Sequence, residues 1–327
     1  MITEFSLDKE FFDSPVLHDV SMSAVHDFIT ENWIERGALV IPGAGHGDLL
    51  GFINKLPEKF KQRWLRAVEY GIKRDVDNEW WNFGDYGSFD ELCKLSTLFK
   101  TAFAEGAVAY VISESDEQKR RCINTGFELL GAGVCSESEN LQRSYLLSRA
   151  DIAPTDAAPD VWDQRLKSFA QCSKKILIVD RYLFTNVREA ATRGQNEDSL
   201  RNFFIYLSQL NSRHNVKIIS FGDQKDSELH AGVHDRINRT ICKIPALSRG
   251  LASLDLVSVA DNFFRDEAHD RFIGFGRHIC QIGLGMAVLG PLPKGRSTFT
   301  AKFDVDGELS ARETASRQFR LWSESMI

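Results

Sequence analysis

Three acidic residues in the first half of the chain stand where short apolar segments end. Asp19 follows the apolar residues of SPVLHDVS, Asp48 follows ALVIPGAGH, and Glu114 closes GAVAYVISES. Carboxylates that meet at one edge of a sheet repel one another unless a hard cation such as Mg²⁺ or Mn²⁺ neutralises them. That cation can also activate a water molecule against a phosphodiester. The alternative for Asp48 is that it caps a helix N-terminus, where acidic residues are favoured.

The tripeptide His-Asp-Arg occurs twice, at 234–236 and at 269–271. The first copy falls in a helical pattern, where His234 and Arg236 point about 200° apart and cannot act on one phosphate. The second copy falls in a strand pattern, where His269 and Arg271 share a face. There the imidazole would serve nucleophilic or acid–base chemistry, and the guanidinium would clamp a phosphate. A hydrogen-bonded network that braces the strand end is the alternative.

The segments that carry these residues alternate between short apolar runs and helical patterns, with a helix end at Gly37 and a break at Pro57. This alternation is typical of a parallel sheet covered on both faces. The sequence therefore predicts an α/β fold with its chemistry at the carboxyl ends of the strands. The expected strands are 14–21, 38–46, 106–115, 127–134, 174–184, 216–223, 254–261, 269–276 and 278–285. The expected helices are 23–37, 48–71, 116–126, 196–214 and 227–244.

Two prolines among small residues in SRADIAPTDAAPD, 148–160, predict a division of the chain. We expect an N-terminal domain at 1–150, a linker at 151–160 and a C-terminal domain at 161–327. A formal net charge of −6 argues against a protein that coats nucleic acid by charge alone. No apolar run is long enough to span a membrane, and the N-terminus carries acids where a signal peptide would carry lysines. The six cysteines are scattered without metal-like spacing, so we expect free thiols in a cytoplasmic protein with no membrane partner.

The segment YVISESDEQKRRCINTGFELLGAGV resembles the third-motif region of PIN-domain nucleases, in which a strand ends in Ser or Thr followed by acids. VLHDVS is similar to the first strand of that family, and ALVIPGAGHGDLLGFI is similar to its second strand and the helix start that follows. The resemblance covers roughly residues 14–140 and leaves 71–105 without a counterpart.

The resemblance implies a PIN-like fold that holds Mg²⁺ or Mn²⁺ through three carboxylates, and the residues that match are Asp19, Asp48 and Glu114. Ser113 matches the hydroxyl of the motif, and Glu137 or Glu139 would support the site. In this family the second acid is usually Glu and the third is usually Asp. This chain reverses the two types.

The second half resembles the phospholipase-D-like domain found at the C-terminus of microtubule-interacting-and-trafficking proteins. The resemblance depends on ILIVDRYLF, on HDRFIGFGRHICQIGLG and on the strand–helix order between them, and it spans about 174–305. It matches Asp180 to the aspartate of the family's first strand, and 269–271 to its His-Asp-Arg. The wider phospholipase D superfamily uses a His-x-Lys unit and a later Asp, whereas this chain has Arg271 for the lysine and Gly276 for the Asp. Arginine can hold a phosphate but cannot replace a lysine that transfers a proton. Members of the C-terminal family look like binding versions of a nuclease fold, so the resemblance implies a site that binds phosphate or a partner.

These patterns predict a metal-dependent nuclease, acting on RNA more readily than on DNA. Its C-terminal domain would recognise a phosphate-bearing ligand or a protein partner through Asp180, His269 and Arg271. By analogy, such a pairing suggests a toxin or an antiviral defence effector. Two alternatives stay open. A non-catalytic adaptor would use two degenerate nuclease folds as interaction surfaces, and a metal-independent phosphodiesterase would pair two copies of His269 across a homodimer.

Overall fold

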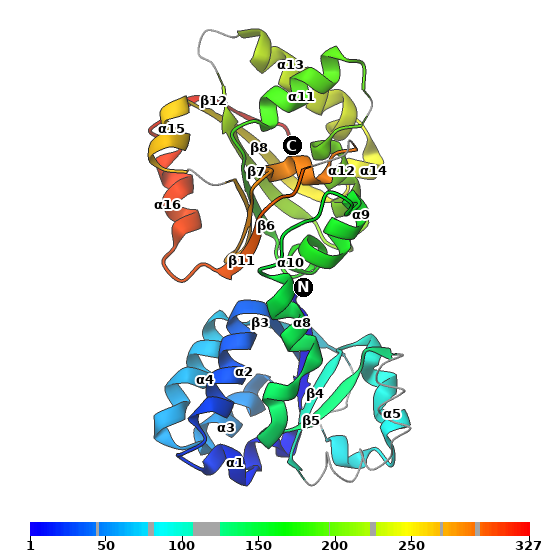
Figure 1. Cartoon of the computed structure of the whole chain (residues 1–327), viewed down its shortest axis with the longest axis vertical. Coiled ribbons are helices and arrows are strands. Elements are labelled where there is room, and N and C mark those ends of the chain that lie inside the picture. Colours follow the sequence, from blue (N-terminus) through cyan, green and yellow to red (C-terminus); the bar gives the residue numbers. More distant parts are fainter. Residues whose placement is uncertain are drawn as a thin grey trace. The chain divides into compact units, whose positions relative to one another are not determined.

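The computed structural model describes residues 1–43, 46–77, 82–106, 125–195, 197–222, 227–268, 271–291 and 295–327. The chain divides into two compact units, which we call the N-terminal unit (Ile2–Leu146) and the C-terminal unit (Leu147–Ile327 with Met1). Residues 151–160 belong to the C-terminal unit, where Ile152 forms an antiparallel β-bridge with Ser297. Each unit is built on a sheet of its own (Figure 1).

Among the described residues, the sheet of the N-terminal unit has five parallel strands in the order β3-β2-β1-β4-β5. From β1 the strand order continues through β2 and β3 on one side, and β4 and β5 lie on the other side. The order of the strands therefore reverses between β1 and β4. The carboxyl edge there is the topological switch point, where α/β proteins tend to bind ligands. The strands are β1 (Thr3–Leu7), β2 (Gly37–Pro42), β3 (Ile72–Val76), β4 (Thr101–Ala104) and β5 (Glu128–Gly131).

Helices cover both faces of this sheet, as Figure 1 shows. On one face, Trp33 and Trp64 pack in a fully buried cluster with Phe5 and Phe103 of the strands. On the other face, a separate cluster contains Phe89 and other buried phenylalanines. The helices are α1 (Pro15–His18), α2 (Ser23–Arg36), α3 (His46–Lys55), α4 (Glu58–Tyr70), α5 (Phe89–Cys93) and α8 (Glu139–Leu147).

The C-terminal unit has a mixed sheet of seven strands in the order β11-β10-β9-β6-β7-β8-β12. Strands β6, β7 and β8 are parallel, and β9, β10, β11 and β12 complete the sheet by antiparallel pairing. The strands are β6 (Lys175–Val179), β7 (His214–Phe221), β8 (Leu251–Val259), β9 (Phe272–Phe275), β10 (His278–Ile282), β11 (Phe299–Phe303) and β12 (Arg320–Ser325).

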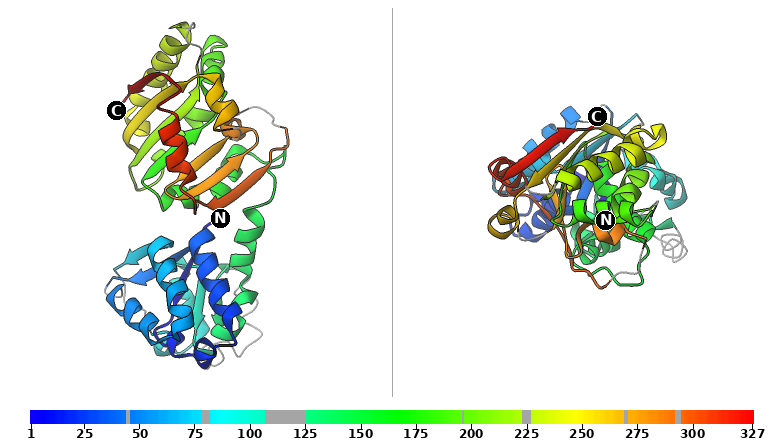
Figure 2. Two further views of the ribbon diagram at one scale, coloured as in Figure 1. Left: turned by 90° about the vertical axis from the view of Figure 1, so that its left-hand side faces the viewer. Right: turned by 90° about the horizontal axis from the view of Figure 1, so that it is seen from above.

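Two helices lie on one face of the mixed sheet and the longer helices lie on the other. Figure 2 shows α15 and α16, orange and red, in front of the sheet, where Phe263, Phe264 and Leu309 join its core. The opposite face is covered by α11 to α14 (Figure 1). The helices are α9 (Ala158–Val161), α10 (Lys167–Gln171), α11 (Leu183–Thr192), α12 (Ser199–Ser208), α13 (Ser227–Ile237), α14 (Pro245–Ser248), α15 (Asp261–Asp266) and α16 (Glu308–Ala315).

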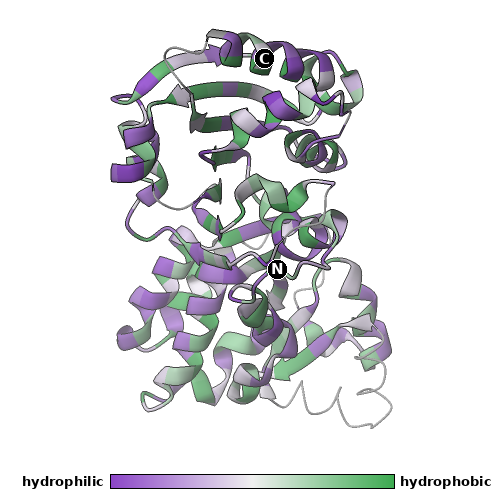
Figure 3. Ribbon diagram, turned by 45° about the horizontal axis from the view of Figure 1, so that its top comes forward, coloured by the Kyte–Doolittle hydropathy of each residue, from purple (hydrophilic) through white to green (hydrophobic). Residues whose placement is uncertain are grey.

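The α/β class and the parallel sheet of the first half are confirmed, the predicted strand at 14–21 is wrong, and residues 107–115 of the predicted strand at 106–115 lie outside the described residues. The segment 14–21 contains the short helix α1, with Pro15 at its first position, and the strand that opens the sheet is β1. The prediction of one long helix with a break at Pro57 is confirmed, since α3 and α4 flank that residue. In Figure 3 the helices carry hydrophilic and hydrophobic residues side by side, as expected of helices with one buried face.

Candidate functional site

Asp19 does not end a strand, and the expectation that it lies at the sheet edge is therefore wrong. It is the exposed residue that terminates α1, and its Oδ1 accepts hydrogen bonds from the backbone N–H and the hydroxyl of Ser21, at 2.8 and 2.7 Å. These two hydrogen bonds hold the pKa of Asp19 below its ordinary value. These hydrogen bonds from Ser21 to Asp19 stabilise a tight turn between α1 and α2.

The other predicted acids of the N-terminal unit are not assembled around a common point. Asp48 is exposed in the first turn of α3, where an acidic residue is favoured by the helix dipole, in agreement with the alternative that places it at a helix N-terminus. Glu137 and Glu139 are also exposed, while Ser113 and Glu114 lie outside the described residues. Within the described ranges, no group of three or more His, Cys, Asp and Glu side chains is arranged as it stands to hold a metal ion. The described acids therefore do not fit Mg²⁺ or Mn²⁺.

Asp8, which no sequence pattern identified, occupies the position at the end of a strand that was expected of Asp19. It follows β1 directly and is fully buried, with its backbone N–H donating to Phe103 O at 2.8 Å. Its Oδ1 accepts from Phe83 N at 2.9 Å, and its Oδ2 has no hydrogen-bond partner among the described residues. Burial raises the pKa of Asp8 to about 6 against the opposing effect of backbone N–H donors. A carboxyl group at the switch point of this sheet thus keeps its proton at mildly acidic pH.

In the C-terminal unit, Asp180 follows the four buried residues that end β6. Its Oδ1 accepts from Tyr182 N at 3.0 Å and its Oδ2 accepts from Met286 N at 2.8 Å. Burial raises the pKa of Asp180, and the two backbone donors and the nearby Arg271 oppose that rise. Both oxygens act as acceptors, so Asp180 ties the end of β6 to the turn at 285–286.

Arg271 immediately precedes β9, and its guanidinium carbon lies 4.7 Å from the centre of the Tyr182 ring. This cation–π contact positions the guanidinium without neutralising it. Asp180 and Arg271, both predicted from the sequence, are thus brought together, because the charge of Arg271 acts on Asp180 and both lie against Gly285. His269, the third predicted residue, lies outside the described residues.

Arg271 lines a cavity of about 310 Å³, which we call the arginine pocket. Arg181 pairs there with Asp261, and Arg265 pairs with Asp266 at 2.8 Å. Among the described residues, no carboxylate lies within ion-pair distance of Arg271. The pocket is lined by Arg181, Tyr182, Asp261, Phe264, Arg265 and Arg271.

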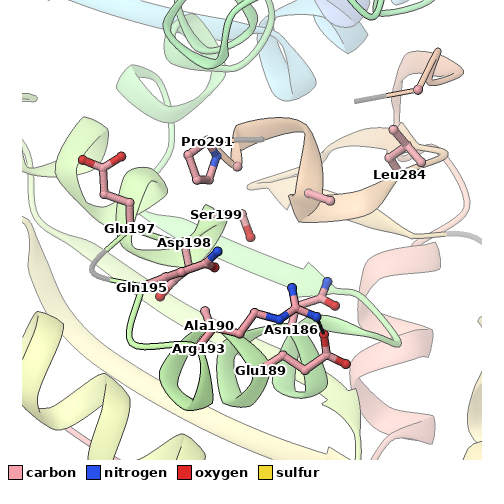
Figure 4. Close-up of a pocket in the computed structure, with 13 residues that line it drawn as sticks. Asn186, Glu189, Ala190, Arg193, Gln195, Glu197, Asp198, Ser199, Leu284 and Pro291 are labelled. Atoms are coloured by element: carbon pink, nitrogen blue, oxygen red, sulfur yellow. Dashed lines mark hydrogen bonds and ion pairs between the residues drawn. The ribbon is translucent and has the colours of Figure 1, made fainter. Parts of the chain in front are cut away.

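A second cavity, of about 330 Å³, lies beside α11 and the loop that precedes α12 (Figure 4). Its lining includes the amides of Asn186 and Gln195. Among the described lining residues the cationic side chain is Arg193, which pairs with Glu189 at 3.0 Å. Because that guanidinium already has a carboxylate partner, this cavity is less suited to an anion than the arginine pocket.

The first His-Asp-Arg copy is explained by two unrelated contacts, as the helical pattern predicted. His234 contacts Glu324 at 2.8 Å, whereas Arg236 turns to the loop before α12 and pairs with Asp198 at 3.0 Å. Arg236 also donates to Gln195 O at 2.7 Å, and both members of the ion pair are about nine-tenths buried. This pair therefore fixes one wall of the second cavity.

Arg236→Met is expected to destabilise the C-terminal unit by about 3 kcal/mol, because it leaves the Asp198 carboxylate buried without its cation. Arg239→Met is the matched control, since Arg239 pairs with Asp235 on the surface and its loss should cost less than about 1 kcal/mol. Urea unfolding followed by circular dichroism measures both. Equal losses in the two variants would contradict a structural role for the buried pair.

In the described part of the chain, no helix is both long enough and apolar enough to cross a membrane. No family model, curated protein or solved structure matches this chain.

Proposed function

We propose that the C-terminal unit recognises a phosphate-bearing ligand in the arginine pocket. The observation that carries this proposal is the guanidinium of Arg271, which is fixed against Tyr182 and has no described carboxylate partner. A planar guanidinium presents N–H donors in a fork that matches two phosphate oxygens. We also propose that this unit is a phospholipase-D-like domain.

The neighbouring residues support anion binding in two ways. Arg181 and Arg265 add guanidinium groups whose carboxylate partners are at the surface, so a phosphate can compete for their free N–H donors. Asp180 is close enough to Arg271 to interact with it electrostatically, and both of its oxygens accept from backbone donors, so it orients the site without taking the place of the ligand. We place single-stranded RNA first among the ligands, because its backbone presents phosphates without the constraint of a duplex.

The test is fluorescence anisotropy of the full chain with a labelled single-stranded RNA, with inorganic pyrophosphate as competitor. Arg271→Gln is expected to weaken binding about 10- to 100-fold, which is the effect of losing a charge-assisted hydrogen-bond pair. Asp261→Asn is expected to tighten binding, because it frees Arg181 from its carboxylate partner. Arg193→Gln, in the second cavity, is the matched control. The proposal fails if Arg271→Gln and Arg193→Gln have equal effects.

The second candidate is metal-dependent phosphodiester hydrolysis by the N-terminal unit, with a PIN-like identity of that unit. The observation that favours it is Asp8, a buried carboxyl with one unpartnered oxygen at the switch point of the parallel sheet. Here Asp8 takes the role first given to Asp19, and Glu114 keeps the role that the resemblance implies. The described acids alone do not form a metal site, so this candidate ranks second.

Cleavage of single-stranded RNA with and without Mn²⁺ separates the remaining possibilities. Activity that is lost in Asp8→Asn and kept in Asp19→Asn supports the second candidate. EDTA-resistant cleavage that is lost in His269→Ala supports the metal-independent phosphodiesterase. If no nucleic acid is cleaved while Arg271→Gln still loses RNA binding, the protein is the adaptor, and the proposal for the arginine pocket is unaffected.

A further inference from the structure

The second cavity is lined by polar side chains that have no hydrogen-bond partner among the described residues. They are the amides of Asn186 on α11 and Gln195 in the loop after it, and the hydroxyl of Ser199 at the start of α12. Ser199 is only 7% exposed, and a polar group buried to this extent is usually satisfied by a partner, a water molecule or a ligand. Three separate segments therefore present free donors and acceptors to one space.

Most charged groups of the second cavity are already paired. Arg193 pairs with Glu189 at 3.0 Å, and Asp198 pairs with Arg236 at 3.0 Å. The remaining carboxylate of the lining, Glu197, is exposed and points away from the other labelled side chains in Figure 4. An ionic ligand would lose its hydration here without gaining an unpaired counter-charge, so the cavity favours an uncharged ligand.

Apolar side chains form the wall that faces α11. Leu284, Ala287 and Pro291 contribute to this wall, and Figure 4 shows Pro291 across the cavity from Arg193 of α11. The volume of about 330 Å³ is at the lower end of the range of about 300 to 1,000 Å³ that is typical of small-molecule sites. The space therefore suits a small ligand with an apolar face and a polar edge.

We propose that the second cavity binds the base of a nucleoside, with adenosine as the reference ligand. A nucleobase is flat and uncharged, has two apolar faces, and carries donors and acceptors side by side along its edge. The side-chain amide of Asn or Gln matches adenine in particular, because its oxygen accepts from N6 and its nitrogen donates to N7. In this arrangement Asn186 and Gln195 contact the edge of the base, and Leu284 and Pro291 contact its face.

Isothermal titration of the full chain with adenosine tests this proposal. We expect one adenosine to bind with a Kd of about 100 μM or tighter. Asn186→Leu keeps the shape of the side chain but removes both of its hydrogen-bonding groups, so it should weaken binding about 10-fold. Asn211→Leu is the matched control, because Asn211 is an exposed asparagine of the same unit outside the cavity. It should leave adenosine binding unchanged.

A second variant closes the cavity without removing a polar group. Ala287→Leu adds three carbon atoms to the apolar wall, so it should abolish adenosine binding while circular dichroism shows that the protein stays folded. Ribose alone, which has no flat apolar face, should not compete with adenosine. The proposal is overturned if adenosine does not bind, if Asn186→Leu and Asn211→Leu bind it equally well, if Ala287→Leu binds it as the native chain does, or if ribose competes.

Anisotropy with the labelled RNA separates two sources of the base, a free nucleoside and the RNA strand itself. Asn186→Leu leaves RNA binding unchanged if the occupant is a free nucleoside, and weakens it if the base belongs to an RNA held in the arginine pocket. Arg271→Gln should leave adenosine binding unchanged in either case, because the two cavities share no lining residue. Failure of one proposal is therefore distinguishable from failure of the other.

Discussion

Gly285→Ala is expected to abolish ligand binding in the arginine pocket and to destabilise the C-terminal unit by about 3 kcal/mol or more. Gly285 has a φ of +58°, in the left-handed region that favours glycine. A Cβ added there would lie 2.1 Å from Asp180 Oδ2 and 2.8 Å from Arg271 Cδ. Neither separation is tolerated, so the buried carboxylate, the turn or the arginine must move, and both predicted site residues are displaced at once.

Gly194→Ala is the matched control for this prediction. Gly194 has a φ of +66° in the same unit, but a Cβ added there meets no atom within 4 Å. Its replacement should cost about 1 kcal/mol, the penalty of a left-handed backbone alone, and should leave RNA binding intact. Thermal unfolding and RNA anisotropy measure both effects. Equal loss of stability and unchanged binding in the two variants would contradict the close approach at Gly285.

Much of the C-terminal site could be predicted because its residues follow strong local patterns. An aspartate directly after a fully apolar run marks the buried end of a central strand, and Asp180 follows such a run. The strand pattern predicts Arg271 within a strand, on one face with His269, whereas β9 begins one residue later, at Phe272. Arg181, Arg265 and Tyr182 join the same pocket through tertiary packing between separate loops, and neither spacing nor periodicity carries that information.

The prediction for the N-terminal site was wrong because the sequence pattern around Pro15 is ambiguous. The segment Pro15–His18 is apolar and short, so its pattern does not separate a strand from a helical turn, but Pro15 after Ser14 is a helix-start signal. Strand β1 contains Glu4, and the edge strand β3 carries three charged residues, so neither shows the continuous apolar run expected of a parallel strand. Asp8 could not be identified as the residue that ends a strand, because the sequence pattern did not reveal β1.

Asp8→Asn is expected to change the pH dependence of the stability of the N-terminal unit. The pKa of Asp8 is raised to about 6 by burial, from an ordinary value of 3.8. Between these two values the folded state binds an extra proton, so the free energy of unfolding falls by about 1.4 kcal/mol per pH unit as pH rises. The stabilising effect of this proton is fully present near pH 4 and is lost above pH 6.

His26 has the opposite effect in the same unit. It is fully buried, stacks on Phe60 with ring centres 3.8 Å apart, and accepts at Nδ1 a hydrogen bond of 2.9 Å from Trp64 Nε1. Burial lowers the pKa of His26 from 6.5 to about 4, so the unfolded state binds the extra proton in this interval. The free energy of unfolding therefore falls, by a similar amount per unit, as pH drops from about 6.5 to 4.

In the native protein, the effects of Asp8 and His26 on the free energy of unfolding cancel between about pH 4 and pH 6. Each variant removes one of the two effects and so reveals the other. Asp8→Asn should be more stable by about 1–2 kcal/mol at pH 7, because the buried charge is gone while the Phe83 N–H keeps an acceptor. The same variant should lose stability on acidification, since the effect of His26 is then unopposed. His26→Gln should show the reverse slope, although loss of stacking on Phe60 lowers its stability at every pH. Urea unfolding at half-unit pH intervals measures the slopes, and an Asp8→Asn profile parallel to the native one between pH 4 and 6 would show that Asp8 does not carry this proton.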